Sequence, residues 1–76
     1  MEEQSLSERE IQVLENISKG YTTKEIARML YLSAHTVISY RKNLMKKLEV
    51  ENAPAMVRRG FEIGILQMHT TLIAKT

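Results

Sequence analysis

The chain has 76 residues, enough for one domain with a thin hydrophobic core. Its hydrophobic fraction of 43% and charged fraction of 26% are typical of a folded globular domain and argue against a disordered chain. The lack of cysteine excludes disulfides and thiolate metal sites, and the two histidines, His35 and His69, are too far apart for a zinc site. We therefore expect no metal, no cofactor and no small-molecule ligand in this domain.

No apolar run reaches the length needed to span a bilayer. The N-terminus is acidic, unlike that of a signal peptide. A cytoplasmic protein is the expectation that follows.

Charge is distributed unevenly along the chain. The net charge of +2 alone is a weak indication of nucleic-acid binding. Residues 1–16 hold five acids against one base, whereas residues 34–48 hold Arg41, Lys42, Lys46 and Lys47 and no acid. Such a basic element is typical of a phosphate-binding surface. The alternative is a solvated helix face whose lysines interact favourably with the dipole at the helix C-terminus.

Start and stop signals predict an all-α fold with four helices, at about 7–19, 23–30, 34–48 and 53–63. Capping boxes begin the first two helices, with Ser7 three residues before Glu10 and Thr22 three residues before Glu25. Ser33 begins the third helix, after a three-residue link at 31–33.

Asn52 begins the fourth helix, since Pro54 is tolerated in a first turn. Gly20 and Gly64 end the first and last helices. No segment alternates as a strand would, so we assign no sheet.

Helical spacing also predicts the core. The expected core residues are Val13, Leu14, Ile17, Ile26, Ala27, Leu30, Val37, Tyr40, Leu44, Leu48, Met56, Val57, Gly60, Phe61 and Ile63.

The 34–48 helix has two faces of different chemistry. On a helical wheel, Val37, Tyr40, Leu44 and Leu48 form one apolar stripe. The opposite face carries His35, Ile38, Ser39, Lys42 and Lys46. Cations, small hydroxyls and a methyl-bearing side chain are the groups that read a major groove. A short helix, a three-residue turn and a longer basic helix make the helix-turn-helix pattern.

At these spacings the chain resembles the LuxR-type (GerE- or FixJ-like) DNA-binding domain of bacterial transcription regulators, over about residues 6–66. The resemblance rests on an ordered series: LSERE at 6–10, Val13-Leu14, Gly20, KEIA at 24–27, Leu32-Ser33 with Thr36-Val37, Lys47-Leu48 and Asn52. It implies an N-terminal extension at 1–5, the domain at 6–66 and a C-terminal tail at 67–76. It also implies that the chain is the output domain of a response regulator or a ligand-sensing regulator.

The resemblance implies roles for individual residues. Base-facing residues would be Ile38, Ser39 and Lys42, and the fourth helix would form a dimer contact through Met56, Val57 and Gly60. Residues near the DNA backbone would be Lys24, Ser33, His35, Thr36, Arg41 and Lys46. Many relatives have lysine at the position of Ile38, which here favours contact with a thymine methyl over a guanine contact. Double-stranded DNA, a second copy of the chain and RNA polymerase are the candidate partners.

Three other functions compete with DNA reading by a transcription regulator. Capping accounts for Glu10 and Glu25, and no nucleophile lies near a base at motif spacing, so we expect no enzyme. A protein-interaction module on the same scaffold that has lost DNA binding is the alternative, because the net charge is small and position 38 is not lysine. A promoter reader like that of a sigma factor uses the same helix pair but fits the fourth helix less well.

Overall fold

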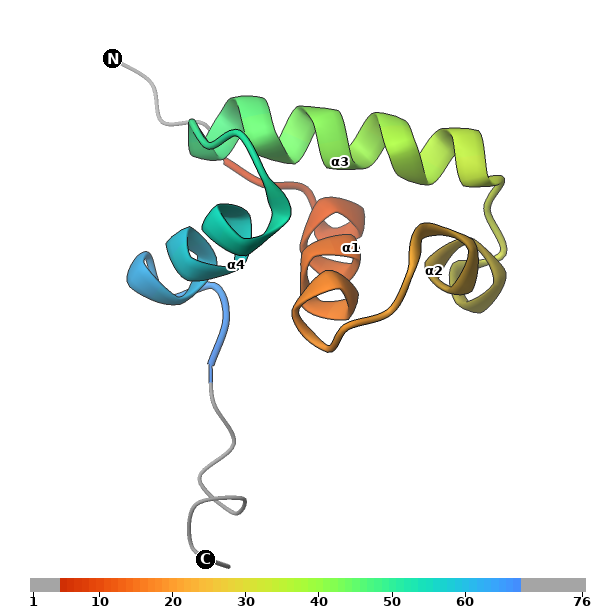
Figure 1. The fold of residues 1–76 in the computed structure, drawn as a ribbon, viewed down its shortest axis with the longest axis horizontal. Helices are drawn as coiled ribbons and strands as arrows, with labels where there is room; N and C mark the ends of the chain where they lie inside the picture. The colour runs from red at the N-terminus through yellow and green to blue at the C-terminus, as the bar shows by residue number, and fades with distance from the viewer. Residues whose placement is uncertain (1–4, 68–76) are drawn as a thin grey trace, which may run out of the picture.

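A computed structural model of the chain describes residues 5–67, which form four α-helices joined by short connections. The helices are α1 (Glu8–Ser18), α2 (Thr23–Leu30), α3 (Ala34–Leu48) and α4 (Ala53–Glu62), and no strand occurs between residues 5 and 67 (Figure 1). The expected all-α fold is confirmed, and every helix end lies within one residue of its expected position.

Side-chain caps begin the helices where the sequence predicts them. Ser7 Oγ accepts a hydrogen bond from the Glu10 amide at 3.1 Å, and the Glu10 carboxylate accepts one from the Ser7 amide at 2.8 Å. Thr22 and Glu25 form the same reciprocal pair. The side chain of Asn52 caps α4. These bonds satisfy amides that a first helical turn leaves without backbone partners.

Residues in the left-handed conformation lie just beyond all four helices. Gly20 (φ +90°) and Gly64 (φ +83°) follow α1 and α4, as expected from sequence. Tyr31 (φ 58°) and Glu49 (φ 59°) end α2 and α3, although a side chain disfavours this conformation. The sharp turn at Tyr31 lets α3 start three residues later.

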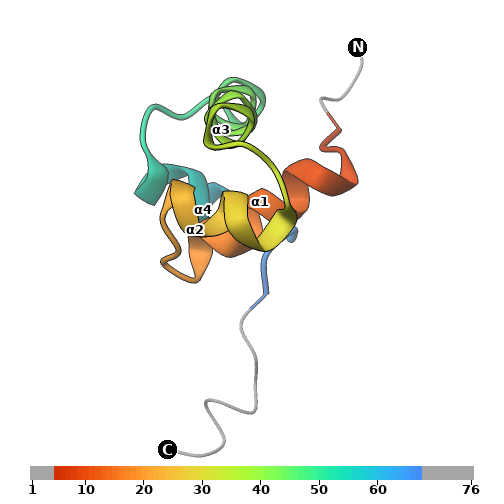
Figure 2. The ribbon, with the colours of Figure 1, turned by 90° about the vertical axis from the view of Figure 1, so that its right-hand side faces the viewer.

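Helix α3 lies along one side of the molecule, across the other three helices (Figures 1 and 2). It crosses α2 steeply in both views, so the two form the expected helix-turn-helix pair. All four helices contribute to one core. Its largest fully buried side chains are Leu14, Ile26, Leu44, Met56, Val13 and Val37.

The core expectation was wrong at the end of α4. Phe61 is 41% exposed and Ile63 is 50% exposed, because α4 buries the face that carries Met56 and Gly60. Leu66, which the sequence did not indicate, fills the core instead at 5% exposure. Leu30, Tyr40, Val50 and Val57 are only partly buried at its margin.

None of the helices within residues 5–67 is long and apolar enough to cross a membrane. The expectations for the extension at 1–5 and the tail at 67–76 fall largely outside the described residues, and His69 lies wholly outside them.

Candidate nucleic-acid interface

The outer face of α3 is open to solvent. Val37, Leu44 and Leu48 are buried against the other helices, which turns the opposite side of α3 outward. The exposed residues on that side are His35, Ile38, Ser39, Lys42 and Lys46. The sequence predicted this division of α3 into a buried stripe and an exposed face, and the burial of the side chains confirms it. We call these five exposed residues the reading face.

A single apolar side chain interrupts the polar character of the reading face. Ile38 follows the fully buried Val37 and is itself 41% exposed. Its neighbour Ser39 is small and exposed, and Lys42 lies one helical turn further along the same face. This arrangement places a methyl-rich group beside a hydroxyl and a cation.

The start of α3 is held by two hydroxyl groups. Ser33 Oγ accepts from the Thr36 amide at 3.0 Å and donates to Thr36 Oγ1 at 2.9 Å. The Ser33 proton is used inside the cap, whereas Thr36 keeps its own hydroxyl proton for another acceptor. A phosphate oxygen is an acceptor of this kind.

Two further cations lie on the helix-turn-helix pair, outside the reading face. Lys24 is exposed in the first turn of α2, and Arg41 is half-buried on α3. Among residues 5–67, the ion pairs join Lys47 to Glu10 and two arginines of α4 to Glu62. Lys24, Lys42 and Lys46 take part in none of them, so within this part of the chain their charge is not neutralised by a paired carboxylate. The electrostatic surface therefore suits a polyanion.

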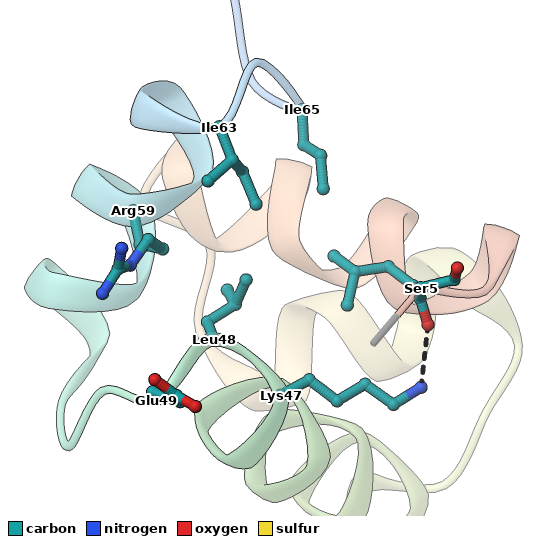
Figure 3. A pocket seen from close by; sticks show the side chains of 8 residues that line it. Ser5, Lys47, Leu48, Glu49, Arg59, Ile63 and Ile65 are labelled. Atoms are coloured by element: carbon teal, nitrogen blue, oxygen red, sulfur yellow. Dashed lines mark hydrogen bonds between the residues drawn. The ribbon is translucent and has the colours of Figure 1, made fainter. Parts of the chain in front are cut away.

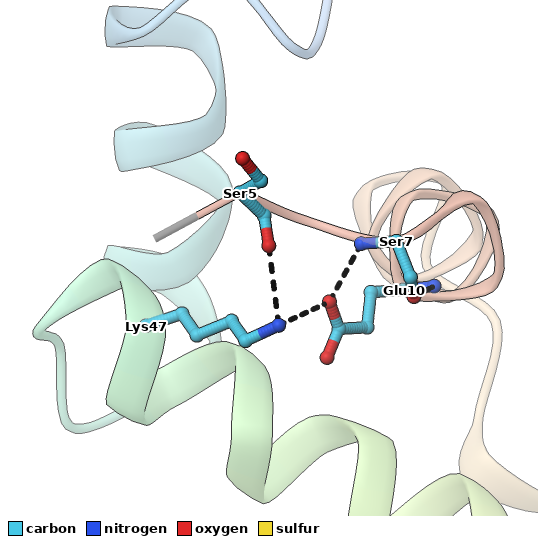
Figure 4. Close-up of polar contacts among 4 residues, drawn as sticks. All are labelled: Ser5, Ser7, Glu10 and Lys47. Atoms are coloured by element: carbon cyan, nitrogen blue, oxygen red, sulfur yellow. Dashed lines mark hydrogen bonds and ion pairs between the residues drawn. The ribbon is translucent and has the colours of Figure 1, made fainter. Parts of the chain in front are cut away.

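Lys47 belongs to a different environment from its neighbour Lys46. Its Nζ donates to Glu10 Oε1 at 2.9 Å and to the Ser5 carbonyl oxygen at 3.2 Å (Figure 4). The Glu10 side chain is only 6% exposed. Burial raises the pKa of Glu10, but hydrogen bonds from the Ser7 backbone and Lys47, with the charge of Lys47, outweigh it and lower the pKa overall. Sequence reasoning missed this pair, because a contact between residues so distant in sequence has no local signal.

A depression of about 530 Å³ lies beside this pair, at the C-terminal end of α3 (Figure 3). Apolar side chains from the N-terminal segment, α3 and the chain after α4 line it, with Lys47, Glu49 and Arg59 as its charged groups. Between residues 5 and 67, no group of three or more metal-ligating side chains could hold an ion.

The expected dimer residues of α4 need correction. Met56 is 0% exposed, and Gly60 packs so closely that a Cβ atom there would lie 3.2 Å from Leu14 Cδ2. Both therefore face the core of their own domain and present nothing to a partner. Val57 is partly buried, and Phe61 is the large apolar side chain that α4 exposes. The family resemblance placed the dimer contact on Met56, Val57 and Gly60, whereas helical spacing placed the same residues in the core, and the burial of Met56 and Gly60 agrees with the core.

A crossed helix pair whose second helix exposes a cationic face defines the class of helix-turn-helix DNA-binding domains. Residues 4–59 match the family described as bacterial regulatory proteins, luxR family. The chain belongs to this family, whose members are DNA-binding regulators of transcription.

Two similar proteins are named as regulatory proteins. The chain is 40% identical over 60 residues to an uncharacterized response regulatory protein, YgeK, of Escherichia coli K12, covering 79% of this chain and 41% of that protein. It is 42% identical over 61 residues to the oxygen regulatory protein NreC of Staphylococcus carnosus, covering 80% and 28%. The chain thus spans less than half the length of either relative.

A solved structure has the same fold. The response regulator ChrA of a heme-sensing two-component system superposes with a TM-score of 0.82 at 29% identity. The match covers 87% of this chain and 33% of the ChrA chain.

Proposed function

We propose that the chain binds double-stranded DNA sequence-specifically, with α3 in the major groove, as the DNA-binding part of a bacterial response regulator. The observation that carries this proposal is the reading face, where exposed cations surround a small hydroxyl and a methyl-bearing side chain. A function of this kind is exercised in the cytoplasm, where bacterial DNA lies, and it needs binding rather than catalysis.

Base recognition is assigned to three side chains of the reading face. Lys42 donates to guanine O6 or N7, Ser39 allows close approach and bonds a base edge, and Ile38 contacts a thymine methyl. The buried stripe of α3 holds these side chains outward, so they reach the groove without a rearrangement of the core.

Phosphate contacts are assigned to residues around this centre. Lys24 and the free amides of the first turn of α2 bind one phosphate, because a helix N-terminus carries partial positive charge. Thr36 donates its hydroxyl proton to another phosphate. The remaining contacts come from His35, Arg41 and Lys46, and from the backbone amide of Ser33, because the Ser33 hydroxyl proton stays in the cap. These contacts hold the domain in register and carry no sequence information directly.

Two copies would bind adjacent half-sites, about 10 base pairs apart. The contact between them would use the outer side of α4, including Val57 and Phe61, in place of the buried Met56 and Gly60. Dimerisation strengthens binding because one small module buries little surface on DNA.

A selection of bound duplexes from a random pool tests the proposal. We expect one enriched motif, and binding to it that weakens steeply as salt rises, because cations that bind phosphates release counterions. A pool without enrichment, together with affinity that does not depend on salt, would contradict DNA reading and support the protein-interaction alternative.

A further inference from the structure

The C-terminal end of helix α3 is hydrogen-bonded to the first turn of α1 and to the segment that precedes it. Lys47 reaches from α3 to Glu10 on α1 and to the carbonyl of Ser5, and these contacts span 37 and 42 residues of sequence. Figures 3 and 4 show the Lys47 side chain extended across the gap between the two elements. One ammonium group therefore connects α3 with both the first turn of α1 and the segment that precedes this helix.

The acceptor on α1 is itself fixed. Glu10 Oε1 accepts from the Ser7 amide at 2.8 Å as well as from Lys47 at 2.9 Å. The same oxygen thus completes the capping box of α1 and accepts the hydrogen bond from α3. The Glu10 side chain is therefore held in one position by both contacts. The pair is also shielded from solvent, with Lys47 28% and Glu10 6% exposed. Shielding keeps a charge-assisted hydrogen bond strong and weakly screened by salt.

Apolar packing alone leaves α3 free to rotate slightly on the domain. The contacts of Lys47 with Glu10 and Ser5, which we call the tether, remove this freedom. Val37, Leu44 and Leu48 hold α3 down, but apolar contacts have no preferred direction. Hydrogen bonds do have one. Residues 38–42 lie roughly 7–14 Å along the helix from Lys47, at about 1.5 Å per residue. A small rotation at the tethered end therefore displaces the base-facing side chains.

We propose that Lys47 is a positioning residue for DNA reading: it sets the orientation of α3 on the domain through Glu10 and Ser5 and does not contact DNA itself. This inference rests on the proposed function. It assigns different roles to two adjacent lysines, because Lys46 is exposed on the reading face whereas Lys47 turns toward α1.

The salt dependence of DNA binding separates the two roles. We compare Lys47→Met with Lys46→Met on the selected duplex. The matched control is Lys19→Met, at the exposed C-cap of α1 and outside the reading face. A substitution at a distance from the ligand changes affinity by about twofold to thirtyfold, and a loss in this range is expected for Lys47→Met with the salt slope unchanged. Lys46→Met should lower the slope by about 0.9, as removal of one phosphate contact does. Lys47→Arg keeps the cation and should bind within about twofold of the wild type.

Three outcomes of this comparison would overturn the proposal. A lower salt slope for Lys47→Met would make Lys47 a phosphate contact. Unchanged affinity would remove its role in binding. Circular dichroism gives the folded fraction of each variant, and a loss of affinity equal to the unfolded fraction would reduce Lys47 to a purely structural residue.

Coupling between the two partners gives an independent test. Glu10→Gln keeps an oxygen for the Ser7 amide but removes the charge that binds Lys47. If Lys47 acts through Glu10, the double variant binds DNA about as weakly as Lys47→Met alone. Fully additive losses would contradict the proposal.

An NMR measurement without DNA separates this proposal from the proposed function. Residual dipolar couplings of the α1 and α3 amides report the angle between the helices. We expect Lys47→Met to change the α3 couplings relative to those of α1, and Lys47→Arg to preserve them. Unchanged couplings in Lys47→Met would reject the tether even if the wild type binds DNA. A changed angle in a chain that binds no DNA would reject the function and leave the tether intact.

Discussion

Leu66 fills the space in the core that a side chain at Gly60 would need. A Cβ atom built at Gly60 would lie 2.7 Å from Leu66 Cδ1, closer than carbon atoms approach, so the absence of a side chain in α4 makes room for Leu66. The chain reverses direction at Gly64 and brings Leu66 back against α4, where its amide bonds the Gly60 carbonyl at 3.0 Å.

Gly60→Ala is therefore expected to destabilise the domain. Overpacking costs about 1–3 kcal/mol, against a gain of about 1 kcal/mol in helix propensity, so the net loss should be about 1 kcal/mol. Urea unfolding measures it. With Leu66→Ala as background, the clash with Leu66 is gone and Gly60→Ala should become neutral or stabilising. An equal loss in both backgrounds would contradict the packing argument.

Stability should fall in acid through Glu10. Its folded-state pKa lies below the ordinary value of 4.5, because the Ser7 amide and Lys47 together outweigh burial. The unfolded chain thus binds the proton more readily, and the stabilisation is present above about pH 4.5 and lost as pH falls through the folded-state pKa. Urea unfolding from about pH 6 to about pH 3 should show a flatter profile for Glu10→Gln than for the wild type. Glu51→Gln, at an exposed position, is the control for removal of a carboxylate.

Lys42 and Lys24 should contribute differently to DNA binding. Lys42→Ala removes a base contact and should relax the preference at one position of the selected motif by about 1–3 kcal/mol. Lys24→Ala removes a phosphate contact and should weaken all sequences alike, with a salt slope lower by about 0.9. Fluorescence anisotropy on the motif and its single-base variants measures both effects. Equal losses on every duplex for Lys42→Ala would place it on the backbone instead.

The contact of Ile38 with DNA should make the affinity depend on a single thymine methyl group. Replacing thymine with deoxyuridine removes only the 5-methyl, and burial of one such group corresponds to about fourfold in affinity. We expect this loss at one position of the motif for the wild type and not for Ile38→Ala. If both proteins respond alike to the replacement, Ile38 does not face a thymine.

Tyr31→Gly should stabilise the domain. Tyr31 is left-handed at φ 58° and is 94% exposed, so its side chain contributes strain and little packing. Relief of that strain is expected to add about 0.5–1 kcal/mol in thermal or urea unfolding. Met29→Gly, which places glycine inside α2, should instead cost about 1 kcal/mol. A loss of stability for Tyr31→Gly would indicate that the tyrosine packs in solution.

Local chemistry made much of this fold predictable. Caps such as Ser7–Glu10 act within four residues, so the helix starts could be predicted from short stretches of sequence. The reading face followed from the spacing of Val37, Leu44 and Leu48 in the same way. Whether these residues contact DNA as assigned remains a prediction.

Contacts that depend on the path of the chain were not predictable. The position of Leu66 in the core depends on the reversal at Gly64, and the pairing of Lys47 with Glu10 depends on how α3 lies across α1. Helical spacing assigned Met56 to the core and the family resemblance assigned it to a dimer contact, and its burial agrees with the first assignment only. Each error therefore concerned three-dimensional packing and not helix formation.

On α3, the residues that pack in the core are different from the residues that we propose read DNA. Ile38, Ser39 and Lys42 are solvent-facing neighbours of the buried Val37 and Leu44. Under the proposed assignment of base contacts to these three positions, substitutions there leave the buried side chains untouched, so one operator preference can be exchanged for another by few mutations. The same property makes the domain a suitable starting point for libraries of engineered DNA readers.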